Sequence, residues 1–476
     1  MPTLQSTASK NYTRPDNVFV SRQLVQALVS CQTVPDAQPM HTDHLPIRTS
    51  FELTVDKPLS CERWDWRKGD WEKFNEALEL ELADLPGLRL VTTQEALDER
   101  VAGIDRAIWK AVKQAVPTLR ITPYSKRWWT PELSKLRRKV RKLARRSYNL
   151  REFGDLEIHK RLRLERNSYT QAVREAKRRH WETFLAELEG DQVWTAGKYL
   201  SAEPTDGARN EDKSRALLEC FFPAPATDLP DFAFSDPASH AAPDLKPLTQ
   251  ADIHSVIQGL RPFKAPGPDR LPACVYKYGA NLLVPHLLPV FRASLRLGIY
   301  PVEWRKSCTV VLRKPGKPDY SVPKAYRPIA LLNVVSKILS ACVAERLTRL
   351  ADKHGWFPAH HFGGRASCNT TVAIHTAVKA IKDAWARGQV VSGLFLDVKG
   401  AFPHADPRRL AANMRRIGVP EPYVTWTLTK LDGRVTTLTF DDYTSPELAI
   451  LNGIDQCCPL SVFYYLTYNS PLIRIP

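Results

Sequence analysis

Apolar residues between positions 126 and 180 recur at intervals that predict two helices. The recurring positions are Leu136, Val140 and Leu143, followed by Tyr169, Val173 and Ala176. Intervals of three and four residues place such side chains on one face of a helix. Most of the other positions are basic or polar, so we expect two basic amphipathic helices.

Start signals indicate two more helices. Thr249 and Asp252 form a capping-box pattern directly before a stretch of apolar residues at helical spacing. Asp406 precedes Pro407, and Gly418 follows eleven residues later, which is the order of an N-cap, a first-turn proline and a C-terminal stop. We therefore expect Asp406 to cap a helix and not to act as a catalytic acid.

Two apolar runs predict strands. Residues 393–396 are continuously apolar, as in a strand that is buried on both faces, and this strand would deliver Asp397 to its end. Residues 435–440 are also typical of a strand, and they lead into Asp441 and Asp442. A hairpin turn is the better interpretation of these two aspartates.

Proline-rich stretches mark the boundaries between these elements. Residues 221–247 contain six prolines and four aspartates, which is the composition of a linker and places a domain boundary there. Residues 264–272 read KAPGPDRLP, where two prolines around a glycine exclude a helix and predict a rigid turn.

The charge of the chain is concentrated in one segment. The 476 residues carry 68 Lys and Arg against 51 Asp and Glu, a net charge of +17. Residues 126–180 hold 19 of these basic residues and only 6 acidic ones. Such a surplus favours nucleic acid as the partner, with a membrane surface as the second choice. We rank the membrane low, because the arginines fall all round the two helices.

The basic segment therefore predicts a track for phosphates with aromatic stacking at one end. Its members would be Trp128, Trp129, Arg137, Arg138, Lys139, Arg141, Lys142, Arg145 and Arg146. The alternative is a pair of solvated helices whose tryptophans pack on a neighbouring element.

The remaining composition favours an intracellular protein, nuclear or cytoplasmic. The longest apolar stretch, at 282–291, is about half of a membrane span, and the N-terminus lacks the apolar segment of a signal peptide. Nine cysteines without a C-x-x-C pair argue against a disulfide framework or a zinc knuckle. We expect free thiols and no membrane contact.

Five segments in the C-terminal half are informative because of the order in which they occur. They are KAPGPDRLP (264–272), LRKPGKPDYSVPKAYRPIALLNVVSKIL (312–339), HFGGRASCNTTVAI (361–374), VVSGLFLDVKGAFPHAD (390–406) and NGIDQCCPLSVFYYL (452–466). Together they resemble the reverse transcriptases of non-LTR (LINE-like) retrotransposons over about 250–476. The resemblance implies polymerase fingers and palm, RNA-templated DNA synthesis from dNTPs on an RNA template and a DNA primer, and two Mg²⁺ ions.

The same resemblance implies roles for single residues. Asp397 would be the first of three metal-binding aspartates, and Phe402 would pack beneath the nucleotide sugar and exclude a ribose 2′-hydroxyl. Phe402 could equally be an ordinary core aromatic, and Asp397 a strand-end cap. Gln456 matches the family's Gln-Gly-x-Pro-Leu-Ser motif, in which Cys457 here replaces the glycine that lets backbone approach closely.

Three cationic residues resemble those with which the family binds the incoming triphosphate. They are Lys314, Lys317 and Arg327. Arg327 is the stronger candidate, because the two lysines could equally be solvated charges of a turn.

The third metal site of the family, a Tyr/Phe-x-Asp-Asp hairpin, is not found by residue 476. Asp441 and Asp442 precede the Gln456 motif and do not match it. We therefore expect an incomplete Mg²⁺ site and no polymerase activity from this chain alone.

The N-terminus resembles a second enzyme. DNVFVS at 16–21 and TDHLPI at 42–47 resemble the last strands of the apurinic-endonuclease-like (endonuclease/exonuclease/phosphatase) fold, an α/β sandwich. His44 would be the general base or phosphate contact, Asp16 its orienting partner, and Asp43 a residue beside the metal and water. The alternative is a loop histidine beside a turn. DNA nicking is expected to be absent.

The predicted fold is α/β throughout, in four parts. Residues 1–57 would be the endonuclease remnant, 58–220 a helical basic connector, 221–247 the linker, and 248–476 the reverse transcriptase fingers and partial palm without thumb. The alternatives are a catalytically dead nucleic-acid-binding remnant and a group II intron maturase. The TDHLPI segment favours the retrotransposon family over the maturase.

Overall fold

A computed structural model describes most of the chain. The described residues are 2–5, 12–38, 42–52, 61–86, 91–121, 126, 128–154, 156–186, 210–225, 246–314, 317, 319–365, 368–440 and 443–473. They form two compact units, the first made of residues 1–63 and 118–203 and the second of residues 64–117 and 204–476. Among the described helices, none has the length and apolar character needed to cross a membrane.

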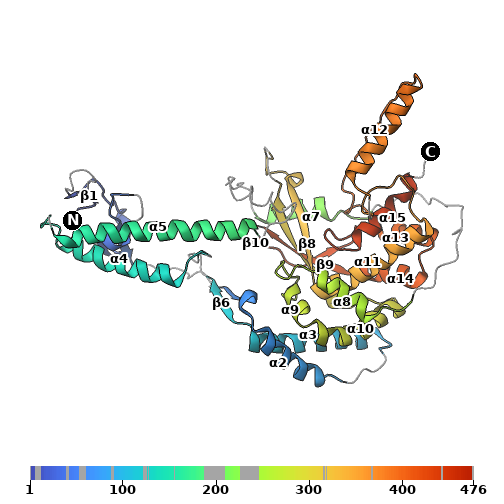
Figure 1. The fold of residues 1–476 in the computed structure, drawn as a ribbon, viewed down its shortest axis with the longest axis horizontal. Coiled ribbons are helices and arrows are strands. Elements are labelled where there is room, and N and C mark those ends of the chain that lie inside the picture. The colour runs from blue at the N-terminus through green and yellow to red at the C-terminus, as the bar shows by residue number, and fades with distance from the viewer. Residues whose placement is uncertain are drawn as a thin grey trace. The chain divides into compact units, whose positions relative to one another are not determined.

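The first unit is built around a helical hairpin of α4 (Pro131–Asn149) and α5 (Glu157–Ala186), which run side by side in Figure 1. Thr130 caps α4 by accepting a hydrogen bond from the Leu133 backbone N–H at 3.3 Å. Val140 and Val173 are buried between the helices, while Leu136 and Leu143 are half-buried. The prediction of two basic amphipathic helices is confirmed.

Short strands complete the first unit. β1 (Leu4–Gln5) pairs with β2 (Tyr12–Thr13), and β3 (Leu28–Thr33) pairs with β4 (Ile47–Phe51), both antiparallel. The short helix α1 (Arg22–Val25) precedes β3, and the 3₁₀ turn η1 (Pro35–Ala37) packs on α4. A third pair joins β5 (Cys61–Trp64) and β6 (Thr118–Ile121).

The N-terminal strands differ from the α/β sandwich that the sequence predicted. The described residues before position 53 form two separate two-stranded sheets. Residues 14–21, expected to include a strand, form none, and Phe19 is 93% exposed. The physical reason is that no described strand takes up the backbone hydrogen bonds of this segment.

A mixed sheet lies at the centre of the second unit. Its strands are β7 (Lys306–Arg313), β8 (Tyr326–Leu332), β9 (Arg434–Phe440), β10 (Tyr443–Thr444) and β11 (Leu448–Ile450). β7 is antiparallel to β8 and parallel to β9. Buried and half-exposed residues alternate along β7 and β9, so one face of the sheet is buried and the other is more open.

Helices make up most of the rest of the second unit, and the majority of them bury its core. They are α2 (Trp71–Ala83), α3 (Gln94–Ala115), α7 (Asn210–Phe221), α8 (Gln250–Gly259), α9 (Ala273–Tyr278), α10 (Ala280–Leu297), α11 (Val334–His354), α12 (Thr370–Ala386), α13 (Pro407–Arg416), α14 (Glu421–Leu431) and α15 (Ser461–Ile473), with 3₁₀ turns η2 (Trp66–Lys68), η4 (Val302–Arg305) and η5 (Pro323–Ala325). A large apolar cluster joins α2, α3, α8–α11 and α13–α15, and a smaller one joins α7 to the sheet.

The predicted start signals are confirmed in the second unit. Thr249 and Asp252 form a reciprocal capping box at α8. Asp406 caps α13 by accepting from the backbone N–H groups of Arg408 and Arg409, and Gly418 has a φ of +90° just beyond that helix. The strands on either side of the predicted 441–442 turn pair through Phe440 and Tyr443, although the two aspartates themselves lie outside the described residues.

The loop at 264–272 contains no helix, as predicted. A side chain at Gly267 would collide with the backbone of Leu332 and Asn333, so glycine lets this loop lie directly against the end of β8. The Asn333 side chain accepts a hydrogen bond from the Asp269 backbone N–H at 3.2 Å.

The structure divides the predicted connector 58–220 between the two units. Helices α2 and α3 pack on α10 of the second unit, and Trp71 stacks on Tyr278 with ring centroids 4.4 Å apart. The division follows from apolar pairing, because α2 and α3 bury their apolar faces in the large cluster. Most of the predicted linker 221–247, namely residues 226–245, lies outside the described residues, and its first residue, Phe221, ends α7.

The predicted strand at 393–396 is wrong. Residues 389–398 have no regular structure, and Leu394, Phe395 and Leu396 are 84%, 96% and 79% exposed. An apolar run becomes a buried strand only where a neighbouring strand accepts its backbone hydrogen bonds, and no described strand pairs with this segment.

Candidate functional site

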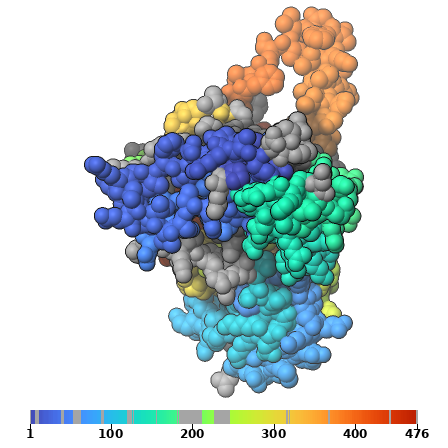
Figure 2. All heavy atoms as spheres, turned by 90° about the vertical axis from the view of Figure 1, so that its left-hand side faces the viewer, coloured from blue at the N-terminus to red at the C-terminus, as the bar shows by residue number. Residues whose placement is uncertain are grey.

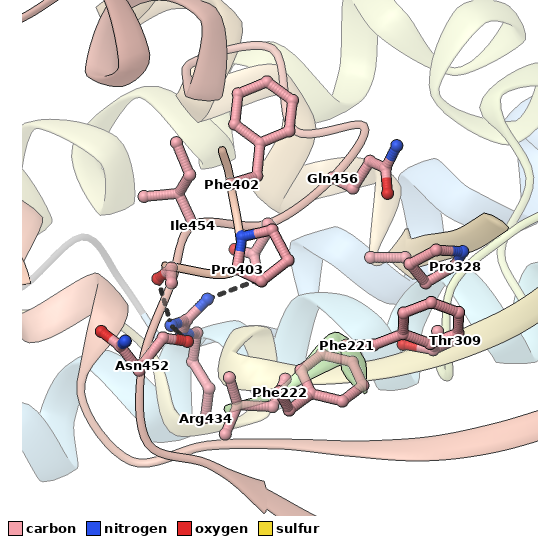
Figure 3. A pocket seen from close by; sticks show the side chains of 14 residues that line it. Phe221, Phe222, Thr309, Pro328, Phe402, Pro403, Arg434, Asn452, Ile454 and Gln456 are labelled. Atoms are coloured by element: carbon pink, nitrogen blue, oxygen red, sulfur yellow. Dashed lines mark hydrogen bonds and ion pairs between the residues drawn. The ribbon is translucent and has the colours of Figure 1, made fainter. Parts of the chain in front are cut away.

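Segments that are far apart in sequence meet in a narrow cleft of the second unit (Figure 3). The cleft has a volume of about 30 Å³, which is room for roughly one or two water molecules. It is lined by Phe221, Phe222, Thr309, Pro328, Ala330, Phe402, Pro403, Arg434, Ile450, Asn452, Gly453, Ile454, Asp455 and Gln456. Two residues singled out from the sequence, Phe402 and Gln456, are therefore brought together.

Gly453 allows the two loops of the cleft to touch. Its φ is +82°, and a Cβ there would lie 2.7 Å from the Pro403 carbonyl oxygen and 2.9 Å from that of Phe402. The Ile454 backbone N–H donates to the same Phe402 oxygen at 3.0 Å. A residue without a side chain is thus required for the loop 452–456 to lie against residues 402–403.

A buried ion pair fixes the loop that carries Gln456. Arg434 on β9 donates to the Asp455 carboxylate at 2.8 Å and to the carbonyl oxygens of Asn452 and Gly453 at 3.2 and 2.6 Å. Lys430 of α14 lies 3.6 Å from the other carboxylate oxygen. The side chains of all three charged residues are at most 5% exposed.

The charge balance of this cluster is set by its two cations. Burial alone would raise the pKa of Asp455, but the positive charges of Arg434 and Lys430 outweigh burial and hold that pKa below its usual range. The carboxylate therefore stays ionised and paired, which keeps the backbone before Gln456 in one conformation.

Cys457 has a backbone conformation that favours glycine. Its φ is +82°, in the left-handed region that L residues with a side chain adopt only at a cost. The structure thus gives a conformational reason for the glycine at this motif position, beyond the close approach that the sequence suggested.

Asp397 lies near Phe402 although it is not at a strand end. The Phe402 ring packs edge-on against Tyr465, with centroids 5.4 Å apart. Burial raises the pKa of Tyr465, and the negative charge of Asp397 raises it further, which places the carboxylate in the same neighbourhood. Asp397 itself is exposed.

The described residues do not provide the donor set of a two-metal site. Mg²⁺ is bound by carboxylate and other oxygen ligands. Asp397 is one such ligand, but within the described ranges no group of three or more His, Cys, Asp or Glu side chains could hold a metal ion.

The predicted triphosphate cations lie elsewhere. Arg327 is exposed on β8, and because side chains alternate along a strand it points away from the face on which Pro328 and Ala330 line the cleft. The Lys314 ammonium donates to the Lys324 carbonyl at 2.8 Å and so closes the β7–β8 loop. Lys317 is exposed in that loop, and its backbone N–H donates to the Tyr320 hydroxyl at 3.4 Å.

In the first unit, part of the predicted basic track is paired with acids. Lys139 lies 2.5 Å from Glu165, Arg145 lies 2.9 Å from Asp36, and Arg141 lies 3.7 Å from the same carboxylate. Arg137 lies over the Trp129 ring, and the other predicted members, Arg138, Lys142 and Arg146, are exposed. Trp128 and Trp129 are half-buried at the start of α4.

The predicted contact between His44 and Asp16 is present. The His44 Nδ1 atom lies 2.8 Å from the Asp16 Oδ2 atom, and this hydrogen bond lowers the pKa of Asp16. Asp43 is half-buried, and its backbone carbonyl accepts from the Gln5 N–H at 3.0 Å. The His44–Asp16 pair is itself exposed to solvent.

Sequence reasoning missed four residues of the cleft. Phe221 ends α7 and Phe222 follows it, far in sequence from the other residues of the cleft, and their place in a linker-like composition concealed them. Arg434 and Asp455 carry charges, which are seldom buried, so only the proximity of Asp455 to Gln456 could have drawn attention to them.

Comparison with known proteins extends this picture. Residues 312–475 match the family model described as reverse transcriptase (RNA-dependent DNA polymerase). The chain is 28% identical to the "Probable RNA-directed DNA polymerase from transposon X-element" of Drosophila melanogaster, over 48% of this chain and 25% of that protein.

Two more relatives from the same organism match over longer stretches. The "Probable RNA-directed DNA polymerase from transposon BS" is 24% identical over 92% of this chain and 50% of its own length. The "RNA-directed DNA polymerase from mobile element jockey" is 25% identical over 71% of this chain and 39% of its own length. The chain thus spans half or less of the length of these relatives. Residues 312–475 are a reverse transcriptase domain, and the chain's relatives are RNA-directed DNA polymerases of non-LTR retrotransposons.

Proposed function

We propose that this chain belongs to an RNA-directed DNA polymerase of a non-LTR retrotransposon, and that Phe402 and Gln456, which line the narrow cleft, border its nucleotide site. The observation that carries the proposal is that Phe402 and Gln456, which are far apart in sequence, line one cleft within the matched domain. The partners would be an RNA template, a DNA primer or target, and dNTPs.

Each residue has a role that its surroundings support. Phe402 is held edge-on by Tyr465, so its ring would offer a fixed apolar surface to a nucleotide sugar. Gln456 follows the rigid Arg434–Asp455 cluster, and its amide can both donate and accept hydrogen bonds. This combination suits the positioning of a deoxynucleotide against its template.

Metal-assisted chemistry needs more ligands than the described residues offer. Asp397 is the one aspartate of the expected metal set that lies in the described part of this site. We therefore expect nucleotide binding but no primer extension by this chain. A chain that only binds nucleic acid is the alternative, and it would show no specific dNTP affinity.

The Asp16–His44 contact favours a second proposal for the first unit. We propose that residues 1–57 hold the C-terminal part of an apurinic-endonuclease-like fold, in which an aspartate orients the histidine that contacts the phosphate. Because the described residues offer no three-ligand metal group, we expect no nicking of supercoiled plasmid by this chain. Nicking that His44→Ala abolishes would contradict that expectation and strengthen the assignment of the fold.

Equilibrium binding of a labelled dNTP to the full chain tests the nucleotide site, in the presence of an RNA template and DNA primer. We expect Gln456→Ala to weaken dNTP binding by about tenfold, equivalent to roughly 1.4 kcal/mol, because one charge-assisted or neutral hydrogen bond is lost. The matched control is Gln258→Ala on the exposed side of α8, which should leave the affinity unchanged. Equal affinities of all three proteins, or no dNTP binding at all, would contradict the proposal.

A further inference from the structure

The first unit contains a pocket between α4, α5 and η1, with a volume of about 330 Å³. This volume is near the lower end of the range for small-molecule sites, roughly 300–1,000 Å³. Figure 2 shows the surface of this unit, with the blue N-terminal residues beside the green-blue residues of the helical hairpin. The pocket joins aromatic and cationic side chains from α4, α5 and the segment before α4, and its lining carboxylate, Asp36, is already paired with Arg141 and Arg145. Such a set fits a ligand that combines a flat ring with negative charge.

Three aromatic side chains form its apolar wall: Trp128, Trp129 and Tyr169. The two indole rings are tilted at 56° with centroids 5.6 Å apart, so they do not cover one another's faces as a stacked pair would. The Trp129 indole N–H donates to the Ser134 hydroxyl at 2.7 Å, which ties this ring to α4. This hydrogen bond holds the Trp129 ring in place before any ligand arrives.

Cations stand directly on these rings. Lys126 and Lys177 lie 5.5 and 5.1 Å from the centre of the Trp128 ring, and Arg137 lies 5.6 Å from that of Trp129. Among the described residues, each of these three cations contacts an aromatic ring, and none forms an ion pair with a carboxylate. A nucleotide could satisfy both groups at once, because its base stacks on a ring while its phosphate meets the adjacent cation.

Arg166 adds a fourth positive charge from α5. Burial lowers the pKa of its guanidinium, and no described acidic side chain pairs with it. A half-buried cation without an acidic partner is poorly solvated, so an arriving phosphate is bound more strongly there than at the exposed, acid-paired Lys139 or Arg145.

We propose that this pocket binds one unpaired nucleotide of a single-stranded nucleic acid. A duplex offers its phosphates but keeps its base faces stacked inside, so it would leave the aromatic wall unused. An acidic peptide would bring charge without a flat ring. The proposal rests on the proposed function only in taking nucleic acid as the partner, and it concerns a site in the other unit.

Fluorescence anisotropy of the full chain tests the proposal, with an oligothymidylate, an abasic oligomer of equal length and charge, and a duplex as labelled probes. We expect the oligothymidylate to bind most tightly. Trp128→Leu should weaken its binding by about 5- to 100-fold, the range for loss of one base–aromatic stack, while abasic binding is unchanged. Arg166→Gln should weaken both single-stranded probes.

Three variants control for folding and for general charge. Trp128→Phe keeps an aromatic ring and should retain most of the affinity for oligothymidylate. Phe153→Ala removes an aromatic side chain that is 63% exposed outside the pocket, and Arg161→Gln removes an exposed charge outside it, so neither should change the preference for bases over abasic backbone.

Two results would overturn the proposal: equal losses for oligothymidylate and abasic oligomer in Trp128→Leu, or displacement of oligothymidylate by an acidic peptide of equal charge. Absence of dNTP binding by the parent chain, with oligothymidylate still bound, would contradict the proposed nucleotide site alone.

Discussion

Cys457 has a backbone conformation that is strained for a residue with a side chain. Its φ of +82° equals that of Gly453 in the same loop, but only glycine adopts this conformation without steric cost. The left-handed conformation costs an L residue about 1–2 kcal/mol. Because Cys457 directly follows Gln456, the conflict lies next to the proposed nucleotide site.

Replacing Cys457 with glycine should therefore stabilise the second unit. We expect Cys457→Gly to raise the free energy of unfolding by about 1 kcal/mol, after allowance for the greater freedom of glycine in the unfolded chain. Urea denaturation followed by tryptophan fluorescence measures the change. Cys457→Ala is the control, since it removes the thiol but keeps the strained φ, and it should gain nothing. If Cys457→Gly is no more stable than Cys457→Ala, the backbone at position 457 is not strained by its side chain.

Single residues were predictable where the signal was local. The cap at Asp406 follows from its own neighbours in sequence, and the family motif placed Phe402 and Gln456 before the structure brought them together. The Arg434–Asp455 pair was not predictable, because a buried charge is recognised only from what surrounds it in three dimensions.

At the scale of elements, the segment 389–398 shows that an apolar run does not by itself predict a strand. The run has the composition of a buried strand, yet its side chains are exposed because no described strand pairs with it. Helices α4, α5, α8 and α13 were predictable, since a helix closes its hydrogen bonds within its own segment and caps itself locally. Strand formation depends on a distant partner, which local sequence does not reveal.

Two phenylalanines, one exposed and one buried, test whether the segment 389–398 lacks a strand. Phe395 is 96% exposed and Phe463 is 2% exposed in α15. We expect Phe395→Ala to change the free energy of unfolding by less than about 0.5 kcal/mol. Phe463→Ala should lower it by about 3–5 kcal/mol, the cost of emptying a buried aromatic site. Chemical denaturation of both variants gives the comparison, and a Phe395→Ala loss as large as that of Phe463→Ala would show that the strand predicted from sequence forms in solution.

At the scale of the whole molecule, the basic charge and the polymerase motifs belong to different units. Most of the surplus charge lies in α4 and α5, while α2 and α3 join the second unit through contacts such as Trp71 on Tyr278. The sequence indicated both functions but not this division, because the apolar faces of α2 and α3 find their partners on α10, nearly two hundred positions further along the chain.

The second unit contains two carboxyl groups that retain protons near neutral pH. Burial raises the pKa of Asp105 to about 7, with a further contribution from Glu303. Burial also raises the pKa of Asp269 to about 7, opposed by its hydrogen bond from Leu271 and assisted by Asp105. Each group binds its proton more tightly in the folded chain than in the unfolded chain, so it disfavours folding once it must ionise.

Stability should consequently fall as the pH rises from about 4 towards about 7. We expect Asp105→Asn, which is neutral at every pH, to gain stability relative to the parent chain as the pH is raised from about 5 to about 8. Thermal unfolding followed by circular dichroism at both pH values measures the gain. Asp432→Asn at an exposed carboxyl is the control, and a gain independent of pH in Asp105→Asn would contradict the assignment.

The central claim is that the cleft at Phe402 and Gln456 recognises a deoxynucleotide. Its most direct test is the affinity of the full chain for a dNTP and for the matching rNTP on a primed RNA template, in the parent chain and in Phe402→Ala. The account predicts that the parent prefers the dNTP and that Phe402→Ala loses the preference by binding the rNTP about tenfold more tightly, a change of roughly 1.4 kcal/mol. An unchanged preference in Phe402→Ala would contradict it.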